Sequence, residues 1–112
     1  MILIDVCCGK GIGALMLAMA LPRSRIIGMD SNTDMDLTHF KAAQNLDFRL
    51  IDVFAGVFPA SVVQLTQGAS WAALVGTHLC GALSPRFVSV FRRCRNPNPN
   101  PNPNPQACVR IS

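Results

Sequence analysis

The chain contains no glutamate and no tyrosine among its 112 residues. General acid–base chemistry would therefore have to come from aspartate, histidine, cysteine or lysine side chains. Charged residues make up only 14% of the chain and hydrophobic ones 50%, which excludes a wholly disordered protein, because such proteins are poor in apolar residues. The longest apolar run, residues 12–21, falls well short of the roughly 20 residues that a membrane helix needs. We therefore expect no contact with a membrane.

The cysteines do not form a disulfide pattern. There are five of them, an odd number, and Cys7 and Cys8 are adjacent. Adjacent cysteines point in divergent directions, so a zinc site is not expected either. No basic segment precedes the apolar run, as it would in a signal peptide. The sequence therefore predicts a reduced, intracellular protein of the cytoplasm or nucleus, with no bound metal.

The net charge of +4 is unevenly distributed. Residues 1–83 carry five basic and six acidic groups, whereas the last 29 residues carry five arginines and no acid. A polyanion would therefore have to bind the C-terminal part, where Arg92, Arg93 and Arg95 cluster. Arginines at the end of a helix also interact favourably with its dipole without any ligand, and this second interpretation stays open.

Short apolar runs alternate with helix-forming segments. The expected strands are 2–6, 25–29, 48–51 and 71–76. The expected helices are 12–20, 34–44, 59–67 and 84–93. Pro22 and Gly68 would end the first and third helices, and Ser84 followed by Pro85 would cap the fourth. This alternation is typical of an α/β fold with a Rossmann-like open parallel sheet and right-handed crossovers.

The C-terminal part contains a repeat. Residues 96–105 are five copies of Asn-Pro. Every second residue lacks an amide hydrogen, and each asparagine is kept out of the helical region by the proline after it. We expect residues 96–106 to be a linker without fixed structure. Residues 107–112 would form a C-terminal stub, in which 107–111 is the one candidate for a fifth strand.

A glycine-rich turn follows the first strand. It reads Asp5-Val6-Cys7-Cys8-Gly9-Lys10-Gly11-Ile12-Gly13. In parallel sheets ligands bind outside the carboxyl ends of the strands, and glycines there let the backbone approach a ligand. Asp30, at the end of the second strand, could accept both hydroxyls of a ribose. The pattern predicts an adenosine-containing ligand. The alternative is that the glycines only allow tight strand-to-helix packing and that Asp30 only caps the second helix.

Two kinds of adenosine ligand fit this turn. Residues 9–14 match Gly-x-Gly-x-x-Ala, a tolerated dinucleotide fingerprint. In a dinucleotide fold, however, the strand residue four before the first glycine is normally apolar, and here it is Asp5. A carboxylate at that point is well placed to hold an ammonium group, directly or through water. Asp5 therefore favours a ligand that carries an amino group.

These residues resemble a known family. Residues 5–11 look like the first motif of class I S-adenosylmethionine-dependent methyltransferases, Asp/Glu-x-Gly-x-Gly-x-Gly, with Cys7 in place of the first glycine. Residues 28–32 resemble that family's motif at the second strand. The chain is most similar to the group of the methyltransferase-like 25 proteins and related tRNA 2′-O-methyltransferases, whose His-x-Cys-Gly motif stands here as residues 78–81. The resemblance implies a partial methyltransferase domain over residues 1–95, with about four strands in the order 3-2-1-4.

The resemblance also implies the cofactor, S-adenosyl-L-methionine, and its site. The implied cofactor-binding residues are Asp5, Cys7, Gly9, Gly11, Asp30 and Asp52. Asp30 would bind the ribose, Asp52 would lie near the adenine amino group, and the other four would line the methionine end. His78 and Cys80 would flank the methyl-transfer site, with His78 as the catalytic base for a hydroxyl acceptor. The plainer interpretation is that both residues only shape their loop.

The chain departs from the family in its length. A complete class I methyltransferase has seven strands, and the later ones complete the acceptor side of the site. Two hypotheses follow. The chain is a methyltransferase or its cofactor-binding fragment, with RNA as a candidate acceptor. Alternatively, it is a non-catalytic interaction module, whose protein partner would cover the unpaired edge expected at strand 71–76.

Overall fold

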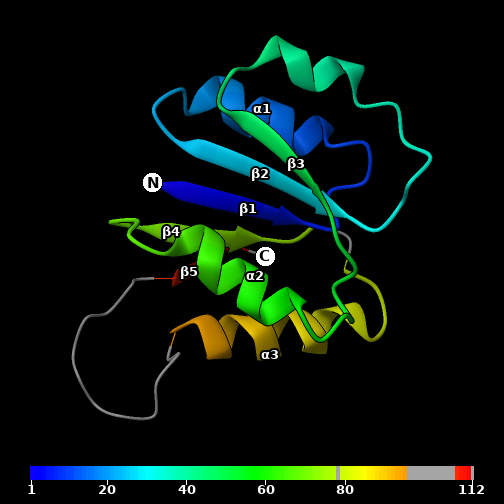
Figure 1. Cartoon of the computed structure of the whole chain (residues 1–112), viewed down its shortest axis with the longest axis vertical. Helices are drawn as coiled ribbons and strands as arrows, with labels where there is room; N and C mark the ends of the chain where they lie inside the picture. Colours follow the sequence, from blue (N-terminus) through cyan, green and yellow to red (C-terminus); the bar gives the residue numbers. More distant parts are fainter. Residues whose placement is uncertain (78, 96–107, 112) are drawn as a thin grey trace.

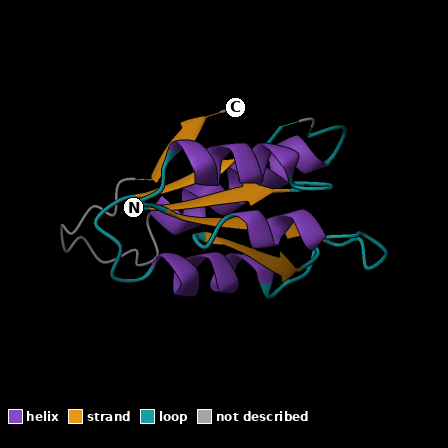
Figure 2. Ribbon diagram, turned by 90° about the horizontal axis from the view of Figure 1, so that it is seen from above, coloured by secondary structure: helices purple, strands orange, loops and turns teal. Residues whose placement is uncertain are grey.

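The computed structural model describes residues 1–77, 79–95 and 108–111. These residues form one parallel sheet with helices on both faces (Figures 1 and 2). The strands lie in the order β3-β2-β1-β4-β5. In chain order the elements are β1 (Ile2–Val6), α1 (Ile12–Ala20), β2 (Arg25–Asp30), the 3-10 helix η1 (Thr38–Ala42), β3 (Leu46–Leu50), α2 (Phe58–Thr66), β4 (Ala72–Val75), α3 (Leu83–Arg95) and β5 (Cys108–Ile111). The first four strands confirm the predicted α/β fold class and the strand order 3-2-1-4.

The central strand β1 pairs with β2 on one side and with β4 on the other. Apart from Arg25, its neighbours in register are apolar residues or glycine, for example Ile27 and Leu74 on either side of Ile4. Strands buried on both faces are expected to be continuously apolar. Asp5 breaks this rule, because it is buried in β1 with Gly28 as its partner on β2.

Two apolar clusters hold the layers together. On one face α2 and α3 run side by side (Figure 1) and bury Phe58 and Phe87 against the sheet. On the other face α1 and η1 cover the sheet with Ala14, Ala18 and Phe40. Helix α1 is apolar on all sides, but it has only nine residues. In the described part of the chain no helix combines the length and the apolar character needed to cross a membrane.

Most element boundaries agree with the sequence prediction. The segments 2–6 and 12–20 are predicted to the residue, and α2 is displaced by one residue. The first turn of α3 differs, because the helix begins at Leu83, before the expected cap. The Ser84 hydroxyl donates to the carbonyl oxygen of Leu79 at 2.6 Å and caps no amide of the described residues, so the cap prediction is wrong.

The predicted helix 34–44 is also wrong. Only η1 forms there, and the preceding residues make a series of side-chain turns. The amide of Asn32 donates to Asp30 Oδ1 at 3.0 Å, that of Asp34 to Asn32 Oδ1 at 2.9 Å, and that of Thr38 to Asp36 Oδ1 at 2.9 Å. Short polar side chains of this kind compete with helical hydrogen bonding, and here they win.

The expected unpaired edge at β4 does not exist. Strand β5 pairs with β4 in parallel, from Ala72 opposite Cys108 to Val75 opposite Ile111. The C-terminal stub therefore supplies the fifth strand and satisfies the β4 backbone groups that a partner would otherwise have to pair. The Asn-Pro repeat, predicted as a linker over residues 96–106, lies outside the described residues.

Candidate functional site

The carboxyl ends of β1, β2 and β3 meet at one edge of the sheet. In register, Val6 is opposite Met29, and Asp30 is opposite Leu50. The residues that leave these three strands therefore come together. The sequence predicted a site there, and the structure places Cys7, Asp30 and Asp52 at that edge.

The turn after β1 has an alternating backbone. Cys7, Gly9 and Gly11 have φ angles of 58°, 55° and 71°, in the left-handed region. Among the described residues, Cys7 is the one non-glycine with positive φ. It occupies the position where the resembled motif has its first glycine. A Cβ atom in this conformation costs about 1–2 kcal/mol, and such strain is typical of functional turns.

Asp30 faces the glycine-rich turn. Its Oδ2 accepts the amide hydrogen of Gly9 at 2.9 Å, and its Oδ1 accepts that of Asn32 at 3.0 Å. No α-helix follows for Asp30 to cap, so this part of the alternative interpretation is wrong. Each carboxylate oxygen has further lone pairs and can accept ligand hydroxyls as well. A Cβ atom built on Gly9 meets no described atom within 4 Å, so the space beside this turn is open.

Gly11 has a different environment. A Cβ atom on Gly11 would collide with the ring of Phe40, and one on Gly28 would lie 3.0 Å from Cys8 Sγ and 3.3 Å from Phe40 Cζ. The packing of Phe40, which lies on η1 and not on the helix that follows the turn, explains both glycines. No pattern in the sequence indicates this contact, because Phe40 was expected on the predicted helix 34–44.

His39 contacts the same turn. Its Nε2 hydrogen-bonds with the carbonyl oxygen of Lys10, and its ring packs edge to face on Phe40. The segment after β2 thus folds back over the turn after β1. His39 is half-buried in this position.

Carboxylates dominate the electrostatics of this edge. Asp5 is 4% exposed, and its Oδ1 has no hydrogen-bond partner in the described structure. Burial raises the pKa of Asp5 to about 6. Burial also raises the pKa of the Cys7 thiol, and the charges of Asp30, Asp5 and Asp52 raise it further. All three carboxylates therefore lie close enough to act on Cys7.

The two thiols of the turn are not activated. Burial, followed by the charges of Asp5 and Asp30, raises the pKa of Cys8 to about 12. A thiol is nucleophilic only as the thiolate, so Cys7 and Cys8 are neutral groups at physiological pH. Among the described residues no three His, Cys, Asp or Glu side chains gather in a way that could hold a metal ion.

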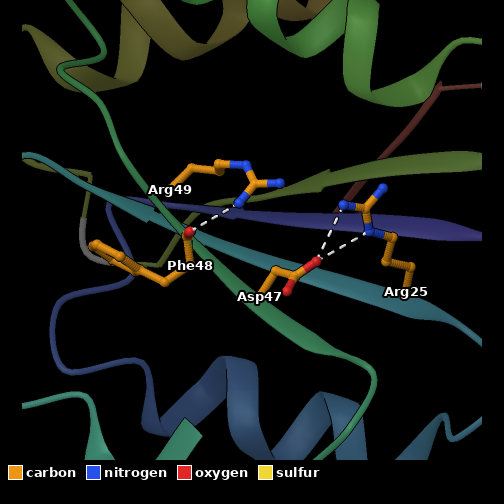
Figure 3. A network of polar contacts seen from close by, with 4 residues as sticks. All are labelled: Arg25, Asp47, Phe48 and Arg49. Atoms are coloured by element: carbon orange, nitrogen blue, oxygen red, sulfur yellow. Dashed lines mark hydrogen bonds and ion pairs between the residues drawn. The ribbon is translucent and has the colours of Figure 1, made fainter.

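No described cation neutralises these carboxylates. Within the described ranges the one salt bridge joins the exposed side chains of Arg25, on β2, and Asp47, on β3, at 3.1 Å (Figure 3). Nearby, Arg49 donates to the carbonyl oxygen of Phe48 at 3.4 Å. Asp5, Asp30 and Asp52 are left without an ion-pair partner, so the candidate site is negatively charged.

Asp52 lies in the turn after β3, and a side chain of α3 hydrogen-bonds to this turn. Its Oδ1 accepts the amide hydrogen of Phe54 at 2.8 Å. Arg86, on α3, donates through Nε to the carbonyl oxygen of Val53 at 2.9 Å and through Nη2 to that of Ala55 at 3.2 Å. The sequence prediction named Asp52 but not Arg86.

The remaining predicted residues belong to the loop between β4 and α3. His78 lies outside the described residues, so the structure does not place the predicted catalytic base. Cys80 is exposed, and its carbonyl oxygen accepts the amide hydrogen of Leu83 at the start of α3. Trp71, at the start of the predicted strand 71–76, is half-buried against the cluster under α1.

Compared with known proteins, the chain matches no family model, no curated protein and no solved structure. The fold is therefore established by the strand order, and the chemistry of the site has to be argued from its own residues.

Proposed function

We propose that the chain binds S-adenosylmethionine, as a methyltransferase or as the cofactor-binding part of one. The supporting observation is that three carboxylates, Asp5, Asp30 and Asp52, lie near the carboxyl ends of the neighbouring strands β1, β2 and β3, with no described cation paired to them. S-adenosylmethionine carries a sulfonium, an ammonium and one carboxylate, so it is a cation overall. A dinucleotide carries an anionic pyrophosphate, which this site would repel.

The residues present fit this cofactor. Oδ1 of Asp5 is buried and has no described hydrogen-bond partner, as expected of a carboxylate that binds the ammonium group of a ligand. Gly9 leaves space beside the turn, and Asp30 lies next to it for the ribose hydroxyls. Asp52 is exposed at the same edge for the adenine amino group. The cofactor supplies an activated methyl group, and the part of these residues is to bind and orient it.

The methyl acceptor follows from the resemblance and from charge. RNA is our candidate, because Arg92 and Arg93 are exposed on α3 and no acid follows Asp52 in the sequence. His78 would accept the proton of an acceptor hydroxyl, a role that depends on the resemblance alone. For the non-catalytic alternative, β5 pairs with the β4 edge at which a protein partner was expected, so a partner would have to bind elsewhere.

Binding is tested by calorimetry on the folded protein with S-adenosylmethionine and, separately, with NAD. We expect binding of the first and not of the second. Asp30→Ala should weaken binding by about 1–3 kcal/mol, because a ribose hydroxyl pair loses its acceptor. Asp34→Ala, an exposed aspartate of the next turn, is the matched control. No binding of S-adenosylmethionine, or equal binding of NAD, would contradict the proposal.

Acceptor identity is tested by incubating the protein with labelled S-adenosylmethionine and total RNA or total protein. We expect label in the RNA fraction. Label in the protein fraction alone would contradict RNA as the acceptor while leaving cofactor binding intact.

A further inference from the structure

Arg86 connects two distant parts of the chain. It lies in the first turns of α3, and its two hydrogen-bond acceptors, the carbonyl oxygens of Val53 and Ala55, precede it by 33 and 31 residues. Both acceptors are neutral, and in the described structure no carboxylate lies within salt-bridge distance of the guanidinium. Arginines that leave water are normally paired with an acid. The half-buried Arg86 instead shapes a main-chain turn.

The turn that Arg86 holds presents Asp52. The Asp52 side chain accepts the amide hydrogen of Phe54 within this turn. The main-chain carbonyl oxygen of Asp52 accepts the amide hydrogen of Ala55 at 3.0 Å. The Arg86 contacts lie between and beside these two bonds. One oxygen of the Asp52 carboxylate is thus tied to the turn. The other, Oδ2, accepts no hydrogen bond from any described residue, and the residue is exposed.

We infer that Arg86 is a positioning residue that fixes Asp52 for recognition of a 6-amino purine. The inference rests on the proposed function and names a part of the same site. A carboxylate oxygen accepts hydrogen bonds only, so it pairs with the amino group of adenine and repels the 6-oxo group of hypoxanthine. This discrimination requires a carboxylate in a fixed place. The planar fork of arginine can bind both carbonyls at once, whereas lysine would act as a point charge.

The test compares two ligands that differ only at purine position 6, S-adenosylhomocysteine and S-inosylhomocysteine. For the wild type we expect calorimetric Kd values that favour the adenine compound by about tenfold. Arg86→Ala should reduce this ratio to about twofold or less, and Asp52→Asn should do the same. The control Arg23→Ala, an exposed arginine at the opposite edge of the sheet, should keep the wild-type ratio.

Amide hydrogen exchange gives a readout without ligand. In Arg86→Ala the amides of Phe54 and Ala55 should exchange faster, whereas Arg23→Ala should leave them unchanged. If Arg86→Ala does not fold, Arg86→Lys takes its place, with an intermediate ratio and intermediate exchange. An Arg86 variant that keeps both the wild-type ratio and the wild-type exchange rates overturns the inference.

The two proposals fail in different ways. A wild type that binds neither compound contradicts the proposed function, whatever Arg86 does. A wild type that binds both compounds with a ratio near one contradicts recognition by Asp52, even if the cofactor is correct.

Discussion

Replacing Asp5 by asparagine should stabilise the ligand-free protein at alkaline pH. Burial raises the pKa of Asp5 from 3.8 to about 6. The folded protein therefore binds this proton more tightly than the unfolded chain does. The stabilisation that the protonated Asp5 gives the folded protein is fully present below pH 3.8 and is lost as the pH rises through about 6. A difference of about two pH units corresponds to about 3 kcal/mol, which is the cost of holding the ionised carboxylate at pH 8.

Urea unfolding of the wild type and of Asp5→Asn at pH 4 and pH 8 measures this cost. Asparagine does not ionise, so the stability of the variant relative to the wild type should be about 2 kcal/mol more favourable at pH 8 than at pH 4. A penalty for an amide without partners is equal at both pH values and cancels in this comparison. Asp34→Asn, at an exposed position, should show no such gain. A difference for Asp5→Asn that is independent of pH would refute the reasoning.

The same substitution should abolish the binding of S-adenosylmethionine. In the wild type, affinity should fall as the pH decreases below about 6, because a cationic ligand needs the ionised carboxylate. A variant that is more stable but does not bind would show that Asp5 is retained for a ligand at the expense of stability. If Asp5→Asn binds like the wild type, the ammonium contact is wrong.

Two further predictions concern the backbone of the turn, and both are measured by urea unfolding. Cys7→Gly should be more stable than Cys7→Ala by about 1 kcal/mol, because the φ angle at this position is 58°. As a control, Ala60→Gly in α2 should destabilise the protein by about 1 kcal/mol. If glycine is less stable than alanine at both positions, this account is contradicted. Gly11→Ala should lower the free energy of unfolding by about 2–4 kcal/mol, because the backbone is left-handed and the new Cβ atom collides with Phe40. Gly9→Ala should lower it by only about 1–2 kcal/mol, because no described atom lies near its Cβ position. Equal losses would show that Phe40 is not the constraint.

Local patterns in the sequence were sufficient for some elements and not for others. The segment 2–6 is apolar and ends in glycines, and the segment 12–20 is rich in helix formers, so each is specified by its own residues. In residues 34–44 the apolar spacing favoured a helix, but turns made by Asp30, Asn32 and Asp36 determine the backbone.

The candidate site was predictable only in part, for a related reason. Asp5 and Asp30 follow from positions near strand ends, which is a local property, whereas Asp52 was implied by the resemblance. Two long-range contacts could not be predicted in this way. One is the contact of Phe40 with Gly11, and the other is the pair of hydrogen bonds from Arg86 to main-chain carbonyl oxygens, which every residue carries. No motif in one sequence specifies such partners. Likewise, the strand β5 was a candidate from its residues, but its pairing with β4 required the fold.

The position of β1 has a consequence for folding during synthesis. It is the first of the five strands to leave the ribosome, yet it lies in the middle of the sheet. Strand β2 soon pairs with one side, but β4, which pairs with the other, ends at Val75, about 45 residues after β2. At about 5–20 residues per second this interval lasts a few seconds. A nascent chain that pauses there exposes an apolar strand edge, the kind of surface that chaperones bind and that aggregating chains share.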